Sequence, residues 1–450
     1  MKHLDAAGMH RRTTGATRRM LYITSLLMMG SVPLQKAVGG ALEDYLNKPD
    51  PHHTWQQLAQ RTEPWGTVSR LELTSQQWRG HFWTHQLLVV EPKVMRNSDI
   101  AFLLIAGDGD GEQYTDMLKT LAQRGGAAAA VMTRIPNQPL FDGRREDALV
   151  AYTFDQYLTT KDKTWPLLFP MVKSVVRGMD TVQAYRGRSA GRRIHRFVVS
   201  GASKRGWTAW LTAAVDRRVK AIAPMVIDML NIRAQLLWAE KVYGKQSEKI
   251  SDYTSLQLHL NLDEPPIQQL RAWIDPYAYR QRYTMPKLLL LGTNDPYWTV
   301  DSLRHYWHDL PEPKWLFQTP NAGHDLGGGG DATQTLAAFF EMIANRHLLP
   351  KVKWTLGDDA GGRATATVRV DRKTKSIRLW SANSVDRDFR NDLWTAHELP
   401  IKAGSHHADA KVPTPPEGYR GYLMEIELHT PSGYPYKLST EARVTPDTMP

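Results

Sequence analysis

The sequence predicts an α/β protein with a mostly parallel sheet, followed by a smaller all-β domain. From Ser69 to about His347, short apolar runs alternate with stretches of helical spacing, which is typical of a sheet covered by helices on both faces. After Pro350 the pattern changes to alternating apolar and polar residues between Gly, Asp, Asn and Pro, which indicates an immunoglobulin-like β-sandwich. We therefore expect a main domain over residues 42–349 and a second over 350–450.

The elements of the main domain follow in order along the chain. The candidate strands cover residues 87–90, 101–106, 129–133, 197–200, 221–226, 288–291 and 315–318. Several are continuously apolar, as strands buried on both faces of a sheet are. The candidate helices cover residues 112–124, 171–185 and 207–215. An aromatic-rich insertion at about 231–285 interrupts this order and is predicted to form a helical cap over the sheet.

Residues 1–41 are predicted to be an export signal that is removed. A basic stretch over residues 11–19 precedes an apolar run over 21–34, and small residues follow that run. The run is shorter than the ~20 residues of a membrane-spanning helix, and Pro33 interrupts it, so we expect no stable membrane anchor. We expect a periplasmic or secreted protein, exported by the Sec or the twin-arginine route. The pair Arg18-Arg19 fits both routes.

Composition excludes several classes of protein. The chain has no cysteine, which rules out a thiol nucleophile, a cysteine-based metal site and disulfides. Residues 1–41 hold six basic groups and one acidic group, so the net charge falls from +11 to +6 without them. The remaining basic residues are scattered and do not form a run with interleaved aromatics, so we expect no nucleic-acid partner.

The segment Gly201-Ala202-Ser203-Lys204-Arg205-Gly206 lies between a candidate strand and a candidate helix. This is the context of a nucleophile elbow, a sharp turn on which a catalytic serine is flanked by small residues. The usual second glycine, two residues after the serine, is Arg205 here, and Gly206 follows it. Alone, Ser203 could equally be an ordinary helix N-cap.

An acid and a histidine follow in the chain order that a Ser-His-Asp hydrolase predicts. Asp295 comes directly after the apolar strand 288–291, and His324 lies in a glycine-containing loop after the last strand. We expect His324 to take the proton of Ser203 while Asp295 fixes its tautomer. Asp228, after the strand 221–226, is the second candidate for the acid.

The glycine-rich segment Gly107-Asp108-Gly109-Asp110-Gly111 follows the strand 101–106. We expect one backbone N–H from Gly107 or Asp108, and that of Lys204, to form an oxyanion hole. Tyr297 and Trp298, next to the acid, are candidate substrate contacts.

Metals and cofactors are not expected. An EF-hand is excluded because Gln113 and Lys119 stand where the calcium loop needs glycine and glutamate. The segment also lacks the Gly-Lys-Ser/Thr ending of a P-loop. His305 and His308 share a predicted helix face but have no evident third zinc ligand.

At these residues the chain resembles the PhoPQ-activated pathogenicity-related protein family. The resemblance rests on five blocks in the main domain and a sixth, Arg387-Asp388-Phe389-Arg390, after it. The five blocks begin at Ile135, Thr164, Gly201, Asn294 and Asn321. The resemblance implies an α/β-hydrolase fold, export from a Gram-negative cell, control by a system that senses magnesium and antimicrobial peptides, and a role in resistance or virulence. It does not imply an established substrate.

The Ser-x-x-Gly elbow is also similar to that of glucuronoyl esterases, in which a basic residue follows the serine; by that analogy the Lys204 side chain could assist the oxyanion. The leading hypothesis is an exported serine hydrolase that cleaves an ester or amide in a small molecule, a peptide or a glycan ester. The alternative is a binding or signalling protein that keeps the fold without catalysis, which the unusual Arg205 and the large aromatic cap suggest.

Overall fold

The computed structural model describes residues 40–190, 193–360, 362–401 and 406–450. These residues all belong to one compact unit. The predicted export signal lies outside the described residues except for its last two positions, and its removal stays a prediction.

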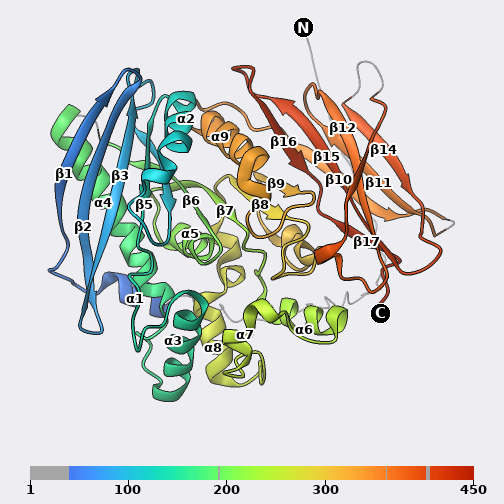
Figure 1. The fold of residues 1–450 in the computed structure, drawn as a ribbon, viewed down its shortest axis with the longest axis horizontal. Helices are drawn as coiled ribbons and strands as arrows, with labels where there is room; N and C mark the ends of the chain where they lie inside the picture. The colour runs from blue at the N-terminus through green and yellow to red at the C-terminus, as the bar shows by residue number, and fades with distance from the viewer. Residues whose placement is uncertain (1–39, 191–192, 361, 402–405) are drawn as a thin grey trace, which may run out of the picture. The chain divides into compact units, whose positions relative to one another are not determined.

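The central element is a nine-stranded sheet with the order β1-β2-β3-β5-β4-β6-β7-β8-β9 (Figure 1). The first three strands form an antiparallel meander, and β3 pairs antiparallel with β5. From β5 to β9 all neighbours are parallel. The strands are β1 (Thr54–Glu63), β2 (Gly66–Trp78), β3 (His81–Pro92), β4 (Ile100–Ile105), β5 (Ala128–Met132), β6 (Arg196–Ala202), β7 (Val219–Met225), β8 (Lys287–Gly292) and β9 (Lys314–Thr319).

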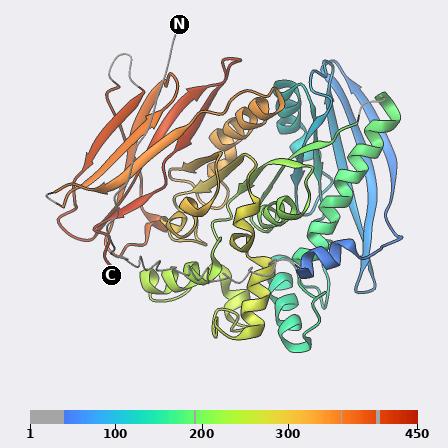
Figure 2. The same cartoon turned by 180° about the vertical axis from the view of Figure 1, so that it is seen from behind.

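Helices cover both faces of this sheet. The buried side chains of α1 (Gly40–Asn47), α3 (Glu146–Thr160), α4 (Leu168–Ala190) and α5 (Lys204–Val215) join one apolar core. Those of α2 (Thr115–Gly125) and α9 (Gly330–Ala344) join the core on the other face. Figure 2, seen from behind, brings the long green helix α4 to the front. The strands β4, β5 and β8 are buried at every position because both faces are covered.

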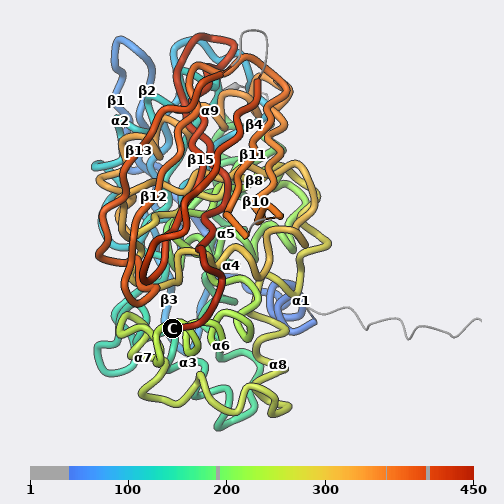
Figure 3. The backbone as a smooth tube through the Cα atoms, turned by 90° about the vertical axis from the view of Figure 1, so that its right-hand side faces the viewer, coloured from blue at the N-terminus to red at the C-terminus, as the bar shows by residue number. Residues whose placement is uncertain are grey.

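The predicted cap is helical. It contains α6 (Ile232–Tyr243), the short α7 (Ser251–Thr254) and α8 (Pro265–Ile274), with 3-10 turns between and after them. In Figures 1 and 3 these helices lie together with α3 below the sheet. The cap and α3 therefore cover the same edge of the sheet.

The C-terminal region forms two antiparallel sheets, with strand orders β10-β11-β14 and β13-β12-β15-β16, and β17 pairs with β15. In Figure 3 these orange to red strands face the viewer. The strands are β10 (Val352–Asp358), β11 (Ala364–Val370), β12 (Ser376–Ser384), β13 (Thr395–Glu398), β14 (His407–Val412), β15 (Tyr419–His429), β16 (Pro435–Ser439) and β17 (Arg443–Thr445).

The C-terminal sheets pack against the main sheet. Trp315 of β9 stacks on Tyr436 of β16 with ring centroids 5.5 Å apart. The backbone N–H of Gln318 donates to the Ser439 hydroxyl at 2.8 Å, and its side chain accepts from the N–H of Ala442 at 3.0 Å. The all-β region is thus fixed directly to the last strand of the parallel half of the sheet.

The predicted fold class is confirmed, and each named strand and helix has a counterpart. Three features differ from the prediction. The sheet begins at Thr54, before the expected Ser69, and its first three strands are antiparallel. The helices α3 and α9 have no counterpart among the candidate helices. The domain limits at 42, 349 and 350 stay a prediction, because both regions fall within the compact unit.

Candidate active site

Ser203 occupies a strained turn between β6 and α5. Its backbone angles are φ 55° and ψ −124°, in a region that side-chain-bearing residues rarely adopt. Its N–H donates to the carbonyl of Met225, on the neighbouring strand, at 2.9 Å. The serine is therefore raised at the carboxyl end of the sheet, in the geometry of a nucleophile elbow.

Two glycines make this turn possible. A Cβ on Gly201 would stand 2.7 Å from the backbone carbonyl of Arg205. A Cβ on Gly206 would stand 2.9 Å from the carbonyl oxygen of Gly201 and 2.8 Å from the side chain of Ile227. Gly206 therefore takes the place of the second elbow glycine, which permits close contact between the helix and the strand.

Arg205, the departure from the usual elbow pattern, has a structural role. Its guanidinium donates two hydrogen bonds to Glu146, at 2.6 and 2.7 Å, and one to the carbonyl of Ile135, at 2.6 Å. It also covers Gly107, where a Cβ would stand 2.7 Å from Nη2. Burial alone would raise the pKa of Glu146, but the hydrogen bonds and charge of Arg205 outweigh it and lower that pKa to about 2. Arg205 thus joins the elbow to the glycine-rich loop and to α3.

His324 and Asp295 form a hydrogen-bonded pair. The imidazole Nδ1 lies 2.8 Å from Oδ2 of Asp295, whose side chain is only 5% exposed. A carboxylate on Nδ1 places the acceptor lone pair on Nε2. That Nε2 is buried and has no hydrogen-bond partner within the described part of the chain. It is therefore available to receive a proton from a substrate or a nucleophile.

The loops that carry this pair approach closely because of Gly292. A Cβ there would stand 2.2 Å from the carbonyl oxygen of Ala322, a distance no side chain tolerates. The N–H of Asn294 donates to that same carbonyl at 2.9 Å. The acid loop after β8 and the histidine loop after β9 therefore share backbone contacts.

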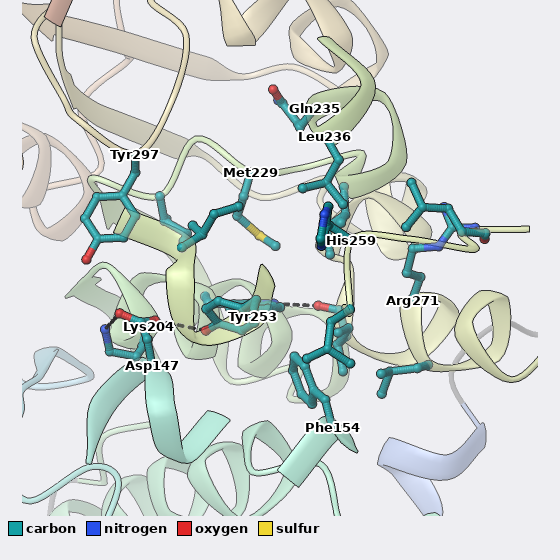
Figure 4. A pocket seen from close by; sticks show the side chains of 18 of the residues that line it. Asp147, Phe154, Lys204, Met229, Gln235, Leu236, Tyr253, His259, Arg271 and Tyr297 are labelled. Carbon is teal, nitrogen blue, oxygen red and sulfur yellow. Dashed lines mark hydrogen bonds and ion pairs between the residues drawn. The ribbon is translucent and has the colours of Figure 1, made fainter. Parts of the chain in front are cut away.

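Tyr297 connects the pair to α3 and the elbow. Its ring lies over the His324 imidazole, with centroids 4.3 Å apart and planes 31° apart. Figure 4 shows its hydroxyl on the side of Asp147 and Lys204. Burial and the nearby carboxylates of Asp147 and Asp295 raise the pKa of Tyr297 to about 12, so the phenol stays protonated.

Asp228, the second candidate acid, has a different partner. It is fully buried and accepts a hydrogen bond from the hydroxyl of Tyr306 at 2.7 Å. Burial raises its pKa to about 8, against the smaller opposing effect of that hydrogen bond. No hydrogen bond joins Asp228 to His324 among the described residues, so the structure favours Asp295 as the partner of the imidazole.

The expected oxyanion residues lie around the elbow. Lys204 is the first residue of α5, where backbone N–H groups have no partner inside the helix. Its ammonium is held by Asp147 at 2.8 Å and Glu146 at 3.3 Å. Asp108 is exposed, and its carboxylate pairs with Arg145 at 2.8 Å, so only its backbone remains a candidate for the oxyanion hole.

A largely apolar cavity of about 140 Å³ lies beside Ser203 under the cap. Tyr297 and Trp298, the expected substrate contacts, both line it, as do Lys204 and Asp147. Figure 4 shows this cavity with side chains from α3, the elbow and the cap around it. The apolar lining is Phe154, Leu158, Trp207, Ile227, Met229, Ile232, Leu236, Ile250, Leu258, Leu262, Ile267, Leu270 and Ile274.

Four further residues organise this site, although the sequence analysis gave none of them a role: Asp147, Tyr253, Asn294 and Asn321. Asp147 accepts from Lys204 and, at 2.9 Å, from the hydroxyl of Tyr253 in the cap. Asn294 donates to backbone carbonyls of the C-terminal region, and Asn321 pairs with the backbone of Trp394 there. Asn294 and Asn321 stand within the blocks that carry the family resemblance. Asn294 directly precedes Asp295, and Asn321 lies three residues before His324, which is the only local sign of their importance.

Neither a metal cluster nor a membrane helix is found in the described ranges. No group of three His, Asp or Glu side chains is arranged there to hold a metal ion. No helix in residues 40–450, as far as they are described, is long and apolar enough to cross a membrane.

The sheet order, the strained serine after β6 and the paired acid and histidine after β8 and β9 define an α/β-hydrolase fold. Residues 42–390 match the model of the PhoPQ-activated pathogenicity-related protein family, and the chain belongs to that family. It is 30% identical to autocrine proliferation repressor protein A of Dictyostelium discoideum, over 91% of each chain.

Two acetyl xylan esterases are among the solved structures that are similar to the chain. The acetyl xylan esterase of Paenibacillus sp. R4 is 13% identical, with a TM-score of 0.48 over 69% of this chain and 93% of that one. Acetyl xylan esterase 1 of Thermoanaerobacterium sp. JW/SL YS485 is 17% identical, with a TM-score of 0.47 over 69% of this chain and 98% of that one.

Proposed function

We propose that this protein is an exported serine hydrolase that cleaves carboxylic esters, with Ser203 as nucleophile, His324 as general base and Asp295 as its orienting acid. The observation that carries the proposal is the 2.8 Å hydrogen bond between Asp295 and Nδ1 of His324, which fixes the imidazole with Nε2 as its proton acceptor. The pair of Asp295 and His324 lies at the same edge of the sheet as the strained Ser203. An unassisted hydroxyl is a poor nucleophile, so these three groups are needed together.

The reaction has two steps, acylation of Ser203 and hydrolysis of the acyl-enzyme. First, the Ser203 oxygen attacks the ester carbonyl while its proton moves to Nε2 of His324, and the alcohol leaves with that proton as the C–O bond breaks. Second, water attacks the acyl-enzyme while His324 takes its proton. His324 then gives this proton to the Ser203 oxygen as the bond between that oxygen and the acyl carbon breaks and the acid leaves. Asp295 stabilises the imidazolium in both steps.

Charge that develops on the carbonyl oxygen would be stabilised by backbone donors. The N–H of Lys204 is one candidate, and an N–H of the loop that begins at Gly107 is the other. The Lys204 ammonium is already engaged by two carboxylates. It therefore positions the start of α5 and is not an oxyanion donor in this mechanism.

Hydrolysis of p-nitrophenyl esters of increasing acyl length, with peptide p-nitroanilides and a glucuronate methyl ester in parallel, tests the proposal. The wild-type protein should release p-nitrophenol, and Ser203→Ala and His324→Ala should each lower kcat by roughly 1,000-fold or more. Ser200→Ala is the matched control, because its hydroxyl is buried against the carbonyl of Ala223. Equal rates for wild type and Ser203→Ala would contradict the proposal.

A second candidate is a binding or signalling protein without catalysis. One observation favours it: no direct hydrogen bond joins Ser203 to His324 among the described residues. The relative named as an autocrine proliferation repressor is consistent with signalling. Ser203→Ala separates the two, because it should retain the cellular function of a binding protein and abolish that of an enzyme.

Export and regulation complete the proposal. The N-terminal pattern supports delivery to the periplasm or the medium, and the family's description suggests control by PhoPQ and a role in virulence or antimicrobial-peptide resistance. Determination of the N-terminal residue of protein recovered from cell fractions tests the first part. An intact N-terminus on cytoplasmic protein would contradict export.

A further inference from the structure

The cavity beside Ser203 has a polar residue at its far side that the proposed mechanism does not use. Arg271 of α8 lines the cavity with Ser203, although the lining is otherwise mostly aliphatic and aromatic. Figure 4 shows Lys204 and Asp147 on one side of the cavity and Arg271 with His259 on the other.

The protein itself supplies little to the guanidinium. Nη2 of Arg271 donates to the backbone carbonyl of Leu262 at 2.6 Å, and this is its only hydrogen bond within the described part of the chain. Its Nε is buried and has no hydrogen-bond partner among the described residues. Burial lowers the pKa of Arg271, because it removes water from the charged form. A half-buried cation with one neutral acceptor is an incomplete ion pair.

The charges of two carboxylates, Asp263 and Asp275, act on Arg271 through space, but both groups are hydrogen-bonded to other residues. Asp263 accepts two hydrogen bonds from Arg233, at 2.9 and 2.7 Å. Asp275 accepts from the backbone N–H groups of Ile232 and Tyr277, at 2.8 and 2.9 Å. Neither forms an ion pair with Arg271 in the described part of the chain, so an anion that arrives with the substrate can supply the missing one.

A second unpaired nitrogen lies on the same side. Nδ1 of His259 is buried and has no partner in the described residues. His259 lines both the cavity and a shallower surface hollow beside it, which also includes Leu262. An anion bound by Arg271 would therefore also lie near Nδ1 of His259.

We propose that the group bound in this cavity is an apolar acyl chain that ends in a carboxylate, with the scissile carbonyl at Ser203 and the carboxylate at Arg271. The proposal rests on the proposed esterase function for its first half. The second half is a binding statement that holds with or without turnover. A carboxylate at the end of the chain can accept two parallel hydrogen bonds from the guanidinium of Arg271.

Turnover of two matched esters is the first test. The mono-p-nitrophenyl ester of adipic acid carries the terminal carboxylate, and p-nitrophenyl hexanoate has the same chain length without it. Wild type should prefer the adipate ester in kcat/KM, and Arg271→Gln should reduce that preference by about tenfold or more while the hexanoate rate stays the same. Lys241→Gln, which removes an exposed charge from α6, should leave the preference unchanged.

Binding to Ser203→Ala by calorimetry is the second test and needs no turnover. Hexanoate and hexanamide are nearly isosteric, so tighter binding of hexanoate measures the charge alone. The preference should vanish when Arg271→Gln is added and return in part with Arg271→Lys. If Arg271→Gln does not fold, the hexanoate to hexanamide comparison in Ser203→Ala alone decides.

The outcomes distinguish the two proposals. Equal binding of hexanoate and hexanamide, or a wild-type enzyme that prefers the neutral ester, overturns the inference and leaves the hydrolase proposal intact. Binding of hexanoate that depends on Arg271, with no turnover of either ester, supports the inference and overturns the proposed function.

Discussion

The side-chain amide of Asn321 forms two hydrogen bonds with the backbone of Trp394. Its Nδ2 donates to the Trp394 carbonyl at 2.9 Å, and its Oδ1 accepts from the Trp394 N–H at 2.7 Å. Asn321 stands three residues before His324, whereas Trp394 lies between β12 and β13 of the C-terminal region. The loop that presents the histidine is therefore held in place by the all-β part of the chain.

Asn321→Ala should loosen this loop. The loss of two hydrogen bonds, with the Trp394 groups left unpaired, should destabilise the protein by roughly 1–3 kcal/mol. Because His324 is displaced while the cavity is not, kcat should fall by about tenfold or more with KM nearly constant. Steady-state kinetics and thermal unfolding measure both effects. Asn391→Ala, at an exposed position near Trp394, is the control, and equal kinetics for the two variants would show that the contact does not position the histidine.

The two candidate acids give different predictions. Asp295→Ala should lower kcat by about 1,000-fold or more, because the imidazole loses the group that fixes its tautomer. Asp228→Asn should keep most activity, because Asp228 contacts Tyr306 and not the imidazole. Activity per folded molecule measures this difference, and the reverse order would identify Asp228 as the acid.

Asp228 should also impose a pH dependence on stability. Its pKa is raised by burial from 3.8 to about 8 in the folded protein, so the folded state holds a proton that the unfolded state releases. Between those values stability falls as pH rises, because the unfolded state binds fewer protons. Asp228→Asn removes this loss, so the Tm difference between variant and wild type should shift in favour of the variant from pH 5 to pH 8. A constant difference would show that Asp228 is ionised in the fold.

Arg205→Gly recreates the usual elbow pattern and should nevertheless be harmful. It removes the two hydrogen bonds to Glu146 and the one to Ile135, and it uncovers Gly107. Charged hydrogen bonds of this kind are worth roughly 2 kcal/mol, less where Glu146 is exposed to water. Both Tm and kcat should fall. Gains in either would mean that the glycine-rich loop does not depend on Arg205.

Much of this architecture could be predicted from local patterns. The apolar runs of β4 and β8 are strands buried on both faces, and their order placed Asp295 and His324 at the same edge as Ser203. By contrast, β1 was not predicted, because its sequence Thr-Trp-Gln-Gln-Leu-Ala-Gln-Arg-Thr-Glu is an exposed edge strand with few apolar residues. Its pairing with β2 is a tertiary property.

The residues that organise the site were harder to predict for the same reason. Asp147 opens α3 as an ordinary acidic residue in a first helical turn, and only the fold brings it to Lys204 and Tyr253. Arg271 belongs to a cap helix with no local sign of a cavity. The role of Gly206 depends on the distance from its Cβ position to the Gly201 carbonyl, which is a tertiary property that no local pattern encodes.

The most direct measurement of the central claim is covalent labelling by a fluorophosphonate, followed by mass spectrometry of the tryptic peptide over residues 197–204. This peptide holds only two serines, Ser200 and Ser203. The account predicts one phosphonyl group on Ser203, unchanged in Ser200→Ala, absent in Ser203→Ala and strongly slowed in His324→Ala. A folded wild-type protein that takes no label, or takes it equally after Ser203→Ala, would contradict the account.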